Sequence, residues 1–329
     1  MPRRCLSLMP RFALTLALLA TATPLSAEET PKPASKKAGV DLMAGPTVTS
    51  DGHPVEFIRA KFVEHGGWGV FQDISYKTGE SLSDYEKERC KLDLYLPKNK
   101  KDYPVIVWFH GGGLTGGQKA GGDTTKVAES WANAGIAVAS VNYRLSPKVK
   151  FPAYIEDGAA AVAWVQKNIA THGGDPKHVF VGGHSAGAYL AMMLGLDAKY
   201  LKAVGVETSS LAGLFPVSGQ TMTHFAVRQE RGLPKDDVIA DEAAPIHFAR
   251  KDAPPMLLLM GDKDWPARLE ENAYFAAILK TKKNETTTLL VVPDRTHGSI
   301  FGKLLEEADP GRAAFLKFVA DPSGFAKQQ

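Results

Sequence analysis

Residues 179–190 read Val179-Phe180-Val181-Gly182-Gly183-His184-Ser185-Ala186-Gly187-Ala188-Tyr189-Leu190. The apolar run at the start, rich in β-branched residues, predicts a buried strand, and the run after the glycines predicts a helix. Ser185 lies at the apex of the sharp turn between them. Gly183 and Gly187 have no Cβ, so strand and helix can pass closely and hold the serine in a strained conformation. Its hydroxyl then projects beyond the sheet, at a helix N-terminus whose N–H groups favour negative charge.

The pattern G-x-S-x-G is common enough to arise by accident, and a glycine-rich structural turn is the plain alternative. Its position between a buried strand and a helix makes it informative. We therefore interpret Ser185 as a catalytic serine.

Strand-like and helix-like runs alternate on both sides of this turn. The expected strands are a hairpin within 55–74 and the runs 91–96 (half-buried), 104–109, 136–141, 179–181, 203–206, 255–260 and 287–292. The expected helices are 127–134, 155–170, 186–196, 268–280 and 311–319. This alternation predicts the α/β class, with a mostly parallel central sheet and helices on both faces. Residues 209–254 lack clean periodicity, and we expect a small cap or an insertion on the substrate side there.

The first 27 residues have the pattern of a secretory signal peptide: arginines, an apolar run over 12–22, and small residues ending at Ala27. The apolar run is too short to span a bilayer, and no later run is long enough. We therefore expect an exported protein, periplasmic or secreted, without stable membrane insertion. Residues 28–50 are rich in Pro, Lys, Ala, Ser and Thr and predict a flexible leader, which leaves 51–329 as the folded domain.

Charge and cysteine content narrow the possible partners. The chain has 39 basic and 36 acidic residues, and the three basic residues in excess are arginines of the signal peptide. The mature chain is then formally neutral, which gives no indication of a nucleic-acid partner. It keeps one cysteine, Cys90, so an internal disulfide is excluded and the fold must depend on its hydrophobic core.

A serine hydroxyl becomes a useful nucleophile only when a base takes its proton and an acid orients that base. In this type of sheet the chain order is serine, acid, histidine, and His297 follows the last expected strand. The acid should follow the strand 255–260, where Asp264 and Asp262 are both available. Asp264 is preferred because it lies further out, whereas Asp262 could instead hold the loop through backbone N–H groups. Glu207 is a more distant third candidate.

Acyl transfer also needs N–H donors aimed at the oxyanion of the tetrahedral intermediate. The run His110-Gly111-Gly112-Gly113 follows an apolar strand upstream of the serine, and its backbone amides can approach the reaction centre closely. We expect Gly112, Gly113 and Ala186, the residue after the nucleophile, to supply these donors. A plain glycine-rich turn is the alternative.

The remaining polar residues indicate structural roles or no role. His184 and His110 are interpreted as packing or loop support, and Arg144 as lining the site or forming an ion pair. The other histidines lack metal-ligand spacing, and no nucleotide-binding glycine motif occurs, so we expect no metal and no cofactor.

As an ordered set, these motifs resemble the α/β-hydrolase esterases, in particular the hormone-sensitive-lipase-like carboxylesterases and the bacterial feruloyl-esterase-like (BD-FAE) branch. The motifs that carry the resemblance are His110-Gly111-Gly112-Gly113, Asn142-Tyr143-Arg144-Leu145, Phe151-Pro152-Ala153, Gly173-Gly174-Asp175-Pro176 and Gly183-His184-Ser185-Ala186-Gly187. The resemblance implies an α/β-hydrolase fold, a triad of Ser185, Asp264 and His297, and an oxyanion hole from the glycine run plus Ala186. Leu114 departs from the aromatic residue that often follows the glycines in such enzymes.

The hypothesis from sequence is an exported serine hydrolase that cleaves a small-molecule carboxylic ester through an acyl-enzyme. Amide chemistry on the same triad, as in an arylformamidase or a peptidase, is the first alternative. A hydrolase fold that only binds its ligand is the second, although all three triad members are present. The oligomeric state is left open.

Overall fold

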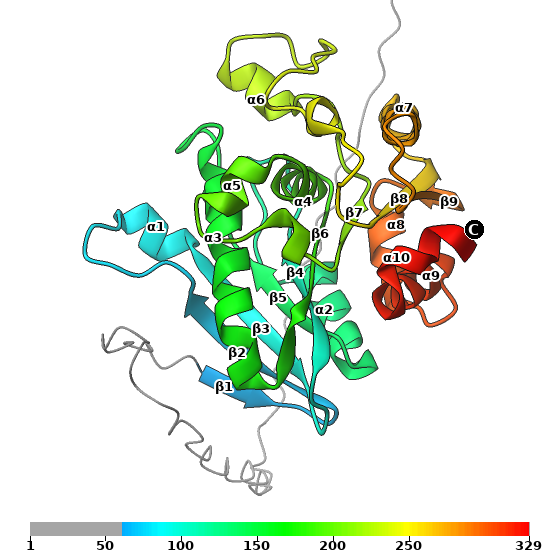
Figure 1. Cartoon of the computed structure of the whole chain (residues 1–329). Coiled ribbons are helices and arrows are strands. Elements are labelled where there is room, and N and C mark those ends of the chain that lie inside the picture. Colours follow the sequence, from blue (N-terminus) through cyan, green and yellow to red (C-terminus); the bar gives the residue numbers. More distant parts are fainter. Residues whose placement is uncertain (1–60, 329) are drawn as a thin grey trace, which may run out of the picture. The chain divides into compact units, whose positions relative to one another are not determined.

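The computed structural model describes residues 61–328, which form a nine-stranded sheet with helices on both faces (Figure 1). The strand order is β1-β2-β3-β5-β4-β6-β7-β8-β9. The pairs β1–β2, β2–β3 and β3–β5 are antiparallel, and every pair from β5 to β9 is parallel. The predicted mostly parallel α/β sheet is therefore confirmed. The strands are β1 Lys61–Glu64, β2 Trp68–Ser75, β3 Lys91–Pro97, β4 Tyr103–Phe109, β5 Ala137–Val141, β6 Gly174–His184, β7 Gly213–Val217, β8 Met256–Lys263 and β9 Thr287–Thr296.

The helices divide between the two faces of the sheet. Helices α3, α4, α5 and α7 pack into one apolar cluster, and α2, α8, α9 and α10 pack into the other. The helices are α1 Asp84–Arg89, α2 Gly122–Ala134, α3 Ala153–Asn168, α4 Ala186–Leu196, α5 Ala198–Lys202, α6 Phe225–Glu230, α7 Arg268–Thr281, α8 Ser299–Gly302, α9 Pro310–Ala320 and α10 Pro322–Phe325. None of these described helices is long and apolar enough to cross a bilayer.

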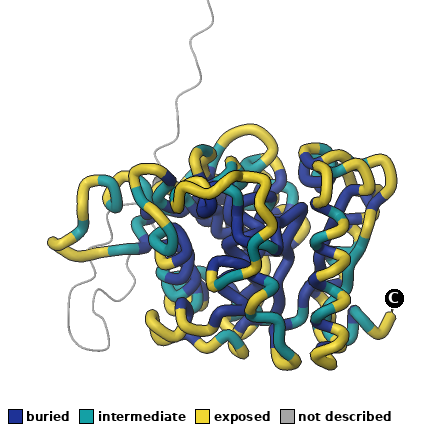
Figure 2. Tube along the Cα trace, turned by 90° about the horizontal axis from the view of Figure 1, so that it is seen from above, coloured by how far each residue is buried: buried dark blue, intermediate teal, exposed yellow. Residues whose placement is uncertain are grey.

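Strand β4 shows how one apolar run serves both faces. Val105, Val107 and Phe109 point into the α3/α4 cluster, while Ile106 and Trp108 point into the α2/α9 cluster. Side chains alternate along a strand, so a continuous apolar sequence is what a strand covered on both faces needs. Burying each such side chain contributes about 1.5–3 kcal/mol to folding. Figure 2 shows the result: the buried segments lie in the middle and the exposed ones around them.

The strand expected at 203–206 is wrong, and the strand at this place in the sheet is β7, Gly213–Val217. Residues 203–206 instead follow the short helix α5 as a turn, where Val204 is 38% exposed. Every residue of β7 is buried between β6 and β8. Pro216 explains why the sequence pattern does not predict this strand, because a proline lacks the N–H that a central strand normally donates.

Strand β3 is buried almost throughout, rather than half-buried as its alternation predicted. The reason is that its polar position has partners: Asp93 accepts from Lys119 Nζ at 2.6 Å and from the backbone N–H of Asp73 at 2.8 Å. A buried carboxylate is tolerated when it is paired and hydrogen-bonded in this way.

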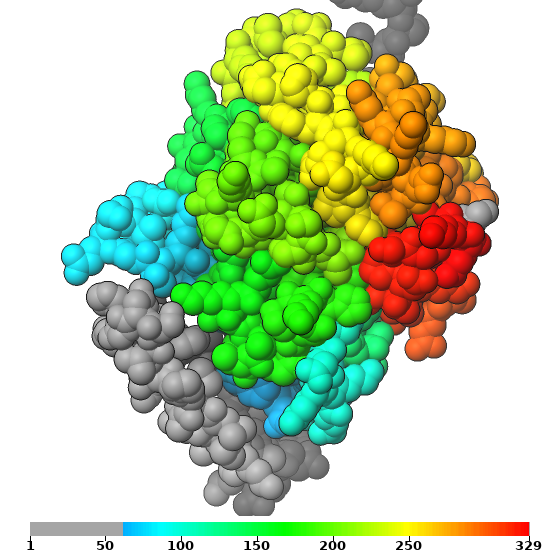
Figure 3. All heavy atoms as spheres, in the orientation of Figure 1, coloured from blue at the N-terminus to red at the C-terminus, as the bar shows by residue number. Residues whose placement is uncertain are grey.

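Residues 209–254, expected to form an insertion, contain β7 at their start. The chain then leaves the sheet over 218–255, carries α6 and a 3₁₀ turn Pro245–Phe248, and returns as β8. In Figure 3 this segment, coloured yellow-green to yellow, forms the upper rim of the visible face beside the orange atoms of α7. The predicted signal peptide 1–27 and leader 28–50 lie outside the described residues.

Candidate active site

The sheet register brings several strand ends to one level. Phe109 at the end of β4 pairs with Gly183, His184 at the end of β6 pairs with Val217, and Val217 pairs with Leu259 in β8. The loops after these strands therefore start side by side at the carboxyl edge of the sheet. Ligands of open α/β sheets bind at this edge.

Ser185 occupies a strained turn between β6 and α4. Its backbone has φ 57° and ψ −117°, a conformation that serine rarely adopts, and its N–H donates to Val217 O at 2.9 Å. The turn requires Gly187 because a Cβ there would overlap the carbonyl of Phe109 in β4. Sheet and helix thus meet with no side chain between them, and the serine remains at the apex.

Ser185, His297 and Asp264 form a hydrogen-bonded chain. The Ser185 hydroxyl lies 2.9 Å from His297 Nε2, and His297 Nδ1 lies 2.8 Å from Asp264 Oδ1. Asp264 directly follows β8 and His297 directly follows β9, so neighbouring strands position the two side chains. The side chains of Ser185 and His297 are both buried.

The electrostatics fix the direction of these hydrogen bonds. Burial alone would raise the pKa of the Asp264 carboxyl, but hydrogen bonds from His297, Ser218 and the Trp265 N–H hold it below its usual value. An ionised carboxylate only accepts, so His297 Nδ1 must carry the proton. Nε2 is then the free acceptor for the serine hydroxyl.

The other two acid candidates lie elsewhere. Asp262 is exposed, and its Oδ1 accepts from the backbone N–H of Arg295 at 3.2 Å, the loop-holding contact weighed as its alternative. Glu207 is exposed on the loop that follows α5. Of the three predicted candidates, Asp264 is the one whose carboxylate contacts His297.

The glycine run lies beside the serine. A Cβ added to Gly111 would come within 3.3 Å of Ser185 Cβ, and one added to Gly113 within 2.9 Å of the Phe225 ring. Gly112 has φ 109°, and its carbonyl accepts from the N–H of Gly116 at 3.0 Å in a tight turn. Ala186 directly follows Ser185 as the first residue of α4.

Two side chains at the site were missed from sequence. Ser218 follows β7, and its buried hydroxyl contacts both the Asp264 carboxylate and His297 Nδ1. No sequence motif marks Ser218. The proline in β7 argues against a strand there, so the sequence does not predict that a strand ends just before Ser218. Trp265 stacks on the His297 ring with centroids 3.6 Å apart while 50% exposed. Its place next to Asp264 is the signal that could have found it.

His184 and His110 have the supporting roles expected of them. His184 Nε2 donates to the carbonyl of His297 at 2.7 Å, and the ring stacks on Phe301. His110 stacks on Tyr143, whose hydroxyl donates to His110 O at 2.8 Å. Burial lowers the pKa of His110 to about 3 and of His184 to about 4, so both rings stay neutral near pH 7. Arg144 forms an ion pair with Asp157 at 2.7 Å.

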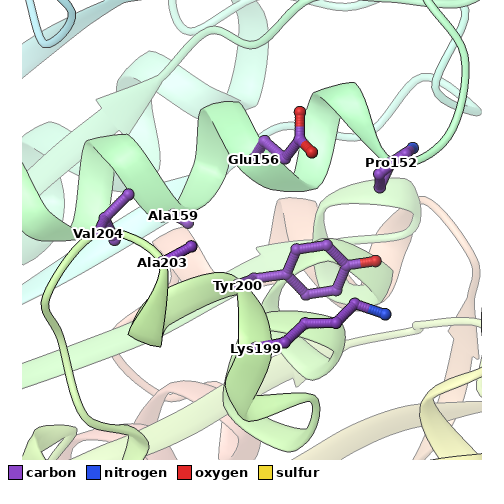
Figure 4. A pocket seen from close by; sticks show the side chains of 7 residues that line it. All are labelled: Pro152, Glu156, Ala159, Lys199, Tyr200, Ala203 and Val204. Atoms are coloured by element: carbon purple, nitrogen blue, oxygen red, sulfur yellow. The ribbon is translucent and has the colours of Figure 1, made fainter.

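A hollow of about 230 Å³ lies between α3 and α5, apart from these residues (Figure 4). Its lining includes Glu156, Lys199 and Tyr200 but no member of the Ser185–His297–Asp264 chain. Within residues 61–328, no three His, Cys, Asp or Glu side chains are grouped closely enough to hold a metal ion.

The sheet order and the helices on both of its faces give this chain the α/β-hydrolase fold. The BD-FAE family model matches residues 92–213, which supports the resemblance to esterases inferred from the motifs. The match runs from Leu92, the second residue of β3, to Gly213, the first residue of β7, and it includes the glycine run and Ser185.

Curated relatives and solved structures point to the same class. The chain is 27% identical over 278 residues to a probable isoprenylcysteine alpha-carbonyl methylesterase of Oryza sativa, covering 77% of this chain and 64% of that protein. It is 28% identical over 212 residues to the esterase LipQ of Mycobacterium tuberculosis, covering 59% and 50%. The chain thus spans about half to two thirds of the length of these relatives. A truncated carbohydrate esterase from gut microbiota shares the fold, with a TM-score of 0.64 at 20% identity, over 77% of this chain and 96% of that one.

Proposed function

We propose that this protein is an exported serine hydrolase that cleaves small-molecule carboxylic esters through an acyl-enzyme. The observation that carries the proposal is the continuous hydrogen-bonded chain from Ser185 Oγ through His297 to Asp264 at the strand–helix turn. The similarity of the protein's sequence to esterases supports ester chemistry over other acyl transfers. Export rests on the arginines and the apolar run of residues 1–27.

In the first half of the reaction, Ser185 Oγ attacks the ester carbonyl carbon while His297 Nε2 takes its proton. The carbonyl π electrons move to oxygen and give a tetrahedral intermediate. Its collapse breaks the bond to the alcohol oxygen, which takes the proton from His297 Nε2. Asp264 orients the imidazole and stabilises its charged form throughout.

In the second half, water attacks the acyl-enzyme carbonyl and His297 takes a proton from that water. Collapse breaks the bond to Ser185 Oγ, which recovers its proton, and the carboxylic acid leaves. The ester, water and the side chains of this site supply every proton and electron pair that the two halves require.

The backbone N–H groups of Gly112, Gly113 and Ala186 are proposed to bind the oxyanion in both halves. Donors fixed in advance stabilise developing charge without reorganising, and losing one such donor typically lowers the rate about 10²- to 10³-fold. The position of the glycine run beside Ser185 supports this assignment.

The test is hydrolysis of p-nitrophenyl esters from acetate to decanoate by the wild type and by Ser185→Ala. We expect kcat to fall by about 10⁴-fold or more in the variant, because the nucleophile of the triad is lost. The chain-length profile of the wild type measures the acyl pocket. Equal, background-level rates for both proteins on every ester would contradict the proposal and direct attention to formamides and peptides.

A further inference from the structure

The Ser218 hydroxyl closes a ring of hydrogen bonds with the two residues that support Ser185. Its Oγ–H donates to Asp264 Oδ2, and its Oγ lies 2.7 Å from His297 Nδ1. His297 Nδ1–H therefore faces two acceptors, Asp264 Oδ1 at 2.8 Å and Ser218 Oγ. A single hydroxyl touches both partners at once.

Counting donors shows what the hydroxyl adds. Asp264 Oδ1 accepts from His297 Nδ1–H and from the backbone N–H of Trp265 at 2.6 Å. Asp264 Oδ2 accepts from Ser218. The Ser218 contact thus fixes the rotation of the carboxylate by holding the oxygen that His297 does not use. Buried carboxylates need such partners on both oxygens.

The backbone holds Ser218 in an uncommon conformation to make these contacts. Its φ is 54°, in the left-handed region that serine seldom occupies. Its N–H donates to Leu259 O at 2.9 Å, and its carbonyl accepts from Arg268 Nη1 at 3.1 Å. Neighbouring β8 and α7 therefore lock the residue in place at the end of β7.

We propose that Ser218 is a positioning residue for catalysis, acting through His297 and Asp264 rather than on the substrate. This inference rests on the proposed triad. When Ser185 transfers its proton, the imidazole becomes charged and its Nδ1–H becomes a stronger donor. The Ser218 oxygen gives that donor a second acceptor, and the Ser218 proton keeps the Asp264 carboxylate aligned for the first.

The experiment compares wild type with Ser218→Ala and Ser218→Gly on p-nitrophenyl acetate. Both variants remove the hydroxyl, but glycine also suits the positive φ that alanine does not. Because a hydrogen bond to a charged group is lost, we expect kcat to fall about 10- to 100-fold in both, with KM within about twofold. A purely structural role would instead make the two variants differ, with activity following their thermal stability.

Two further comparisons isolate the mechanism. Ser140→Ala removes another buried serine hydroxyl, one that donates to Lys119 O at 2.6 Å away from the triad, and it should leave kcat unchanged. In an Asp264→Asn background, Ser218→Ala should cost much less than it does alone, because its effect passes through the missing carboxylate.

The outcomes separate the inference from the proposed function. Wild-type ester hydrolysis with unchanged kcat in both Ser218 variants overturns the inference and leaves the function standing. If the wild type hydrolyses no ester, the inference is tested instead by the rate at which a fluorophosphonate labels Ser185. Labelling needs only an activated serine and no ester substrate. Slower labelling of both Ser218 variants then supports the positioning role. Equal labelling, or none in the wild type, overturns it.

Discussion

At the scale of single residues, two aspartates of the same β8 loop have different surroundings. The side chain of Asp264 is buried against His297, Ser218 and the Trp265 N–H, and these hydrogen bonds hold its carboxyl pKa low. Asp262 is exposed and accepts from one backbone N–H. The environment, not the residue type, thus distinguishes Asp264 as the proposed orienting acid.

Replacing each aspartate by asparagine tests this assignment. Asp264→Asn removes the charge that orients His297 and favours the wrong tautomer, so kcat on p-nitrophenyl acetate should fall about 10³- to 10⁴-fold. Asp262→Asn keeps an oxygen that can accept from Arg295 N–H, and kcat should stay within about threefold. The two substitutions have the same chemistry two positions apart, so each is the other's control. The reverse ranking would assign the acid to Asp262.

At the scale of elements, the turn from β6 to α4 depends on the absence of a side chain at Gly187. Helix α4 is buried along its whole length, and it reaches the sheet because Gly187 passes directly against Phe109 of β4. The neighbouring atoms are backbone of a central strand, which cannot move aside as a flexible side chain would. The same close contact therefore supports both the packing of α4 on the sheet and the position of Ser185, the proposed nucleophile.

Gly187→Ala should consequently be among the most damaging single changes in the chain. We expect the free energy of unfolding, measured by urea titration, to fall by more than about 3 kcal/mol, because the new methyl group overlaps fixed backbone. Gly66→Ala is the matched control, since a Cβ there meets no atom within 4 Å, and its effect should stay within about 0.5 kcal/mol. A loss of stability equal to that of the control would mean that the turn relaxes without cost.

The sequence predicts elements well where local pattern and tertiary role agree. The apolar runs of β4, β6 and β8 mark strands covered on both faces. The chain order of Ser185, Asp264 and His297 follows from their places directly after β6, β8 and β9. Prediction fails at β7, because Pro216 argues against a central strand. The strand is recognised only from its buried position between β6 and β8 in the folded sheet. Ser218 was missed for the same reason, because its role comes from the register of β7 and not from any local motif.

At the scale of the whole described domain, burial keeps several histidines uncharged. Burial is the main cause that lowers the pKa of His110 to about 3, of His184 to about 4 and of His172 and His224 below the usual value. Glu271 is the opposite case, since burial raises its pKa to about 7 despite the nearby Arg268. These groups link the stability of the fold to pH.

The histidines and the glutamate act with opposite sign. Below about pH 6.5 a histidine in the unfolded chain binds a proton, whereas the same histidine buried in the folded protein stays neutral. The free energy of unfolding therefore falls as the pH falls toward the folded pKa. Folded Glu271 takes up its proton near pH 7 and an unfolded glutamate only near pH 4.5, so Glu271 adds stability over the same interval. The pKa values of His110 and His184 lie two or more units below that of a free histidine, so these two rings outweigh Glu271 by about one proton, and His172 and His224 act in the same direction.

We therefore expect the free energy of unfolding to fall by at least about 1 kcal/mol for each pH unit between 6.5 and 4.5, because each net proton taken up on unfolding contributes about 1.4 kcal/mol per pH unit. Urea titrations at half-unit steps measure this slope. Lowered aspartate pKa values, such as that of Asp264, act only further down, as pH falls through about 4, and do not contribute in this interval. His110→Gln removes one buried histidine, so it should lower the number of protons taken up on unfolding by about one and make the slope shallower. His65→Gln, at an exposed position, should leave the slope unchanged. A slope of zero, or equal slopes for wild type and His110→Gln, would show that the buried rings are protonated in the folded protein.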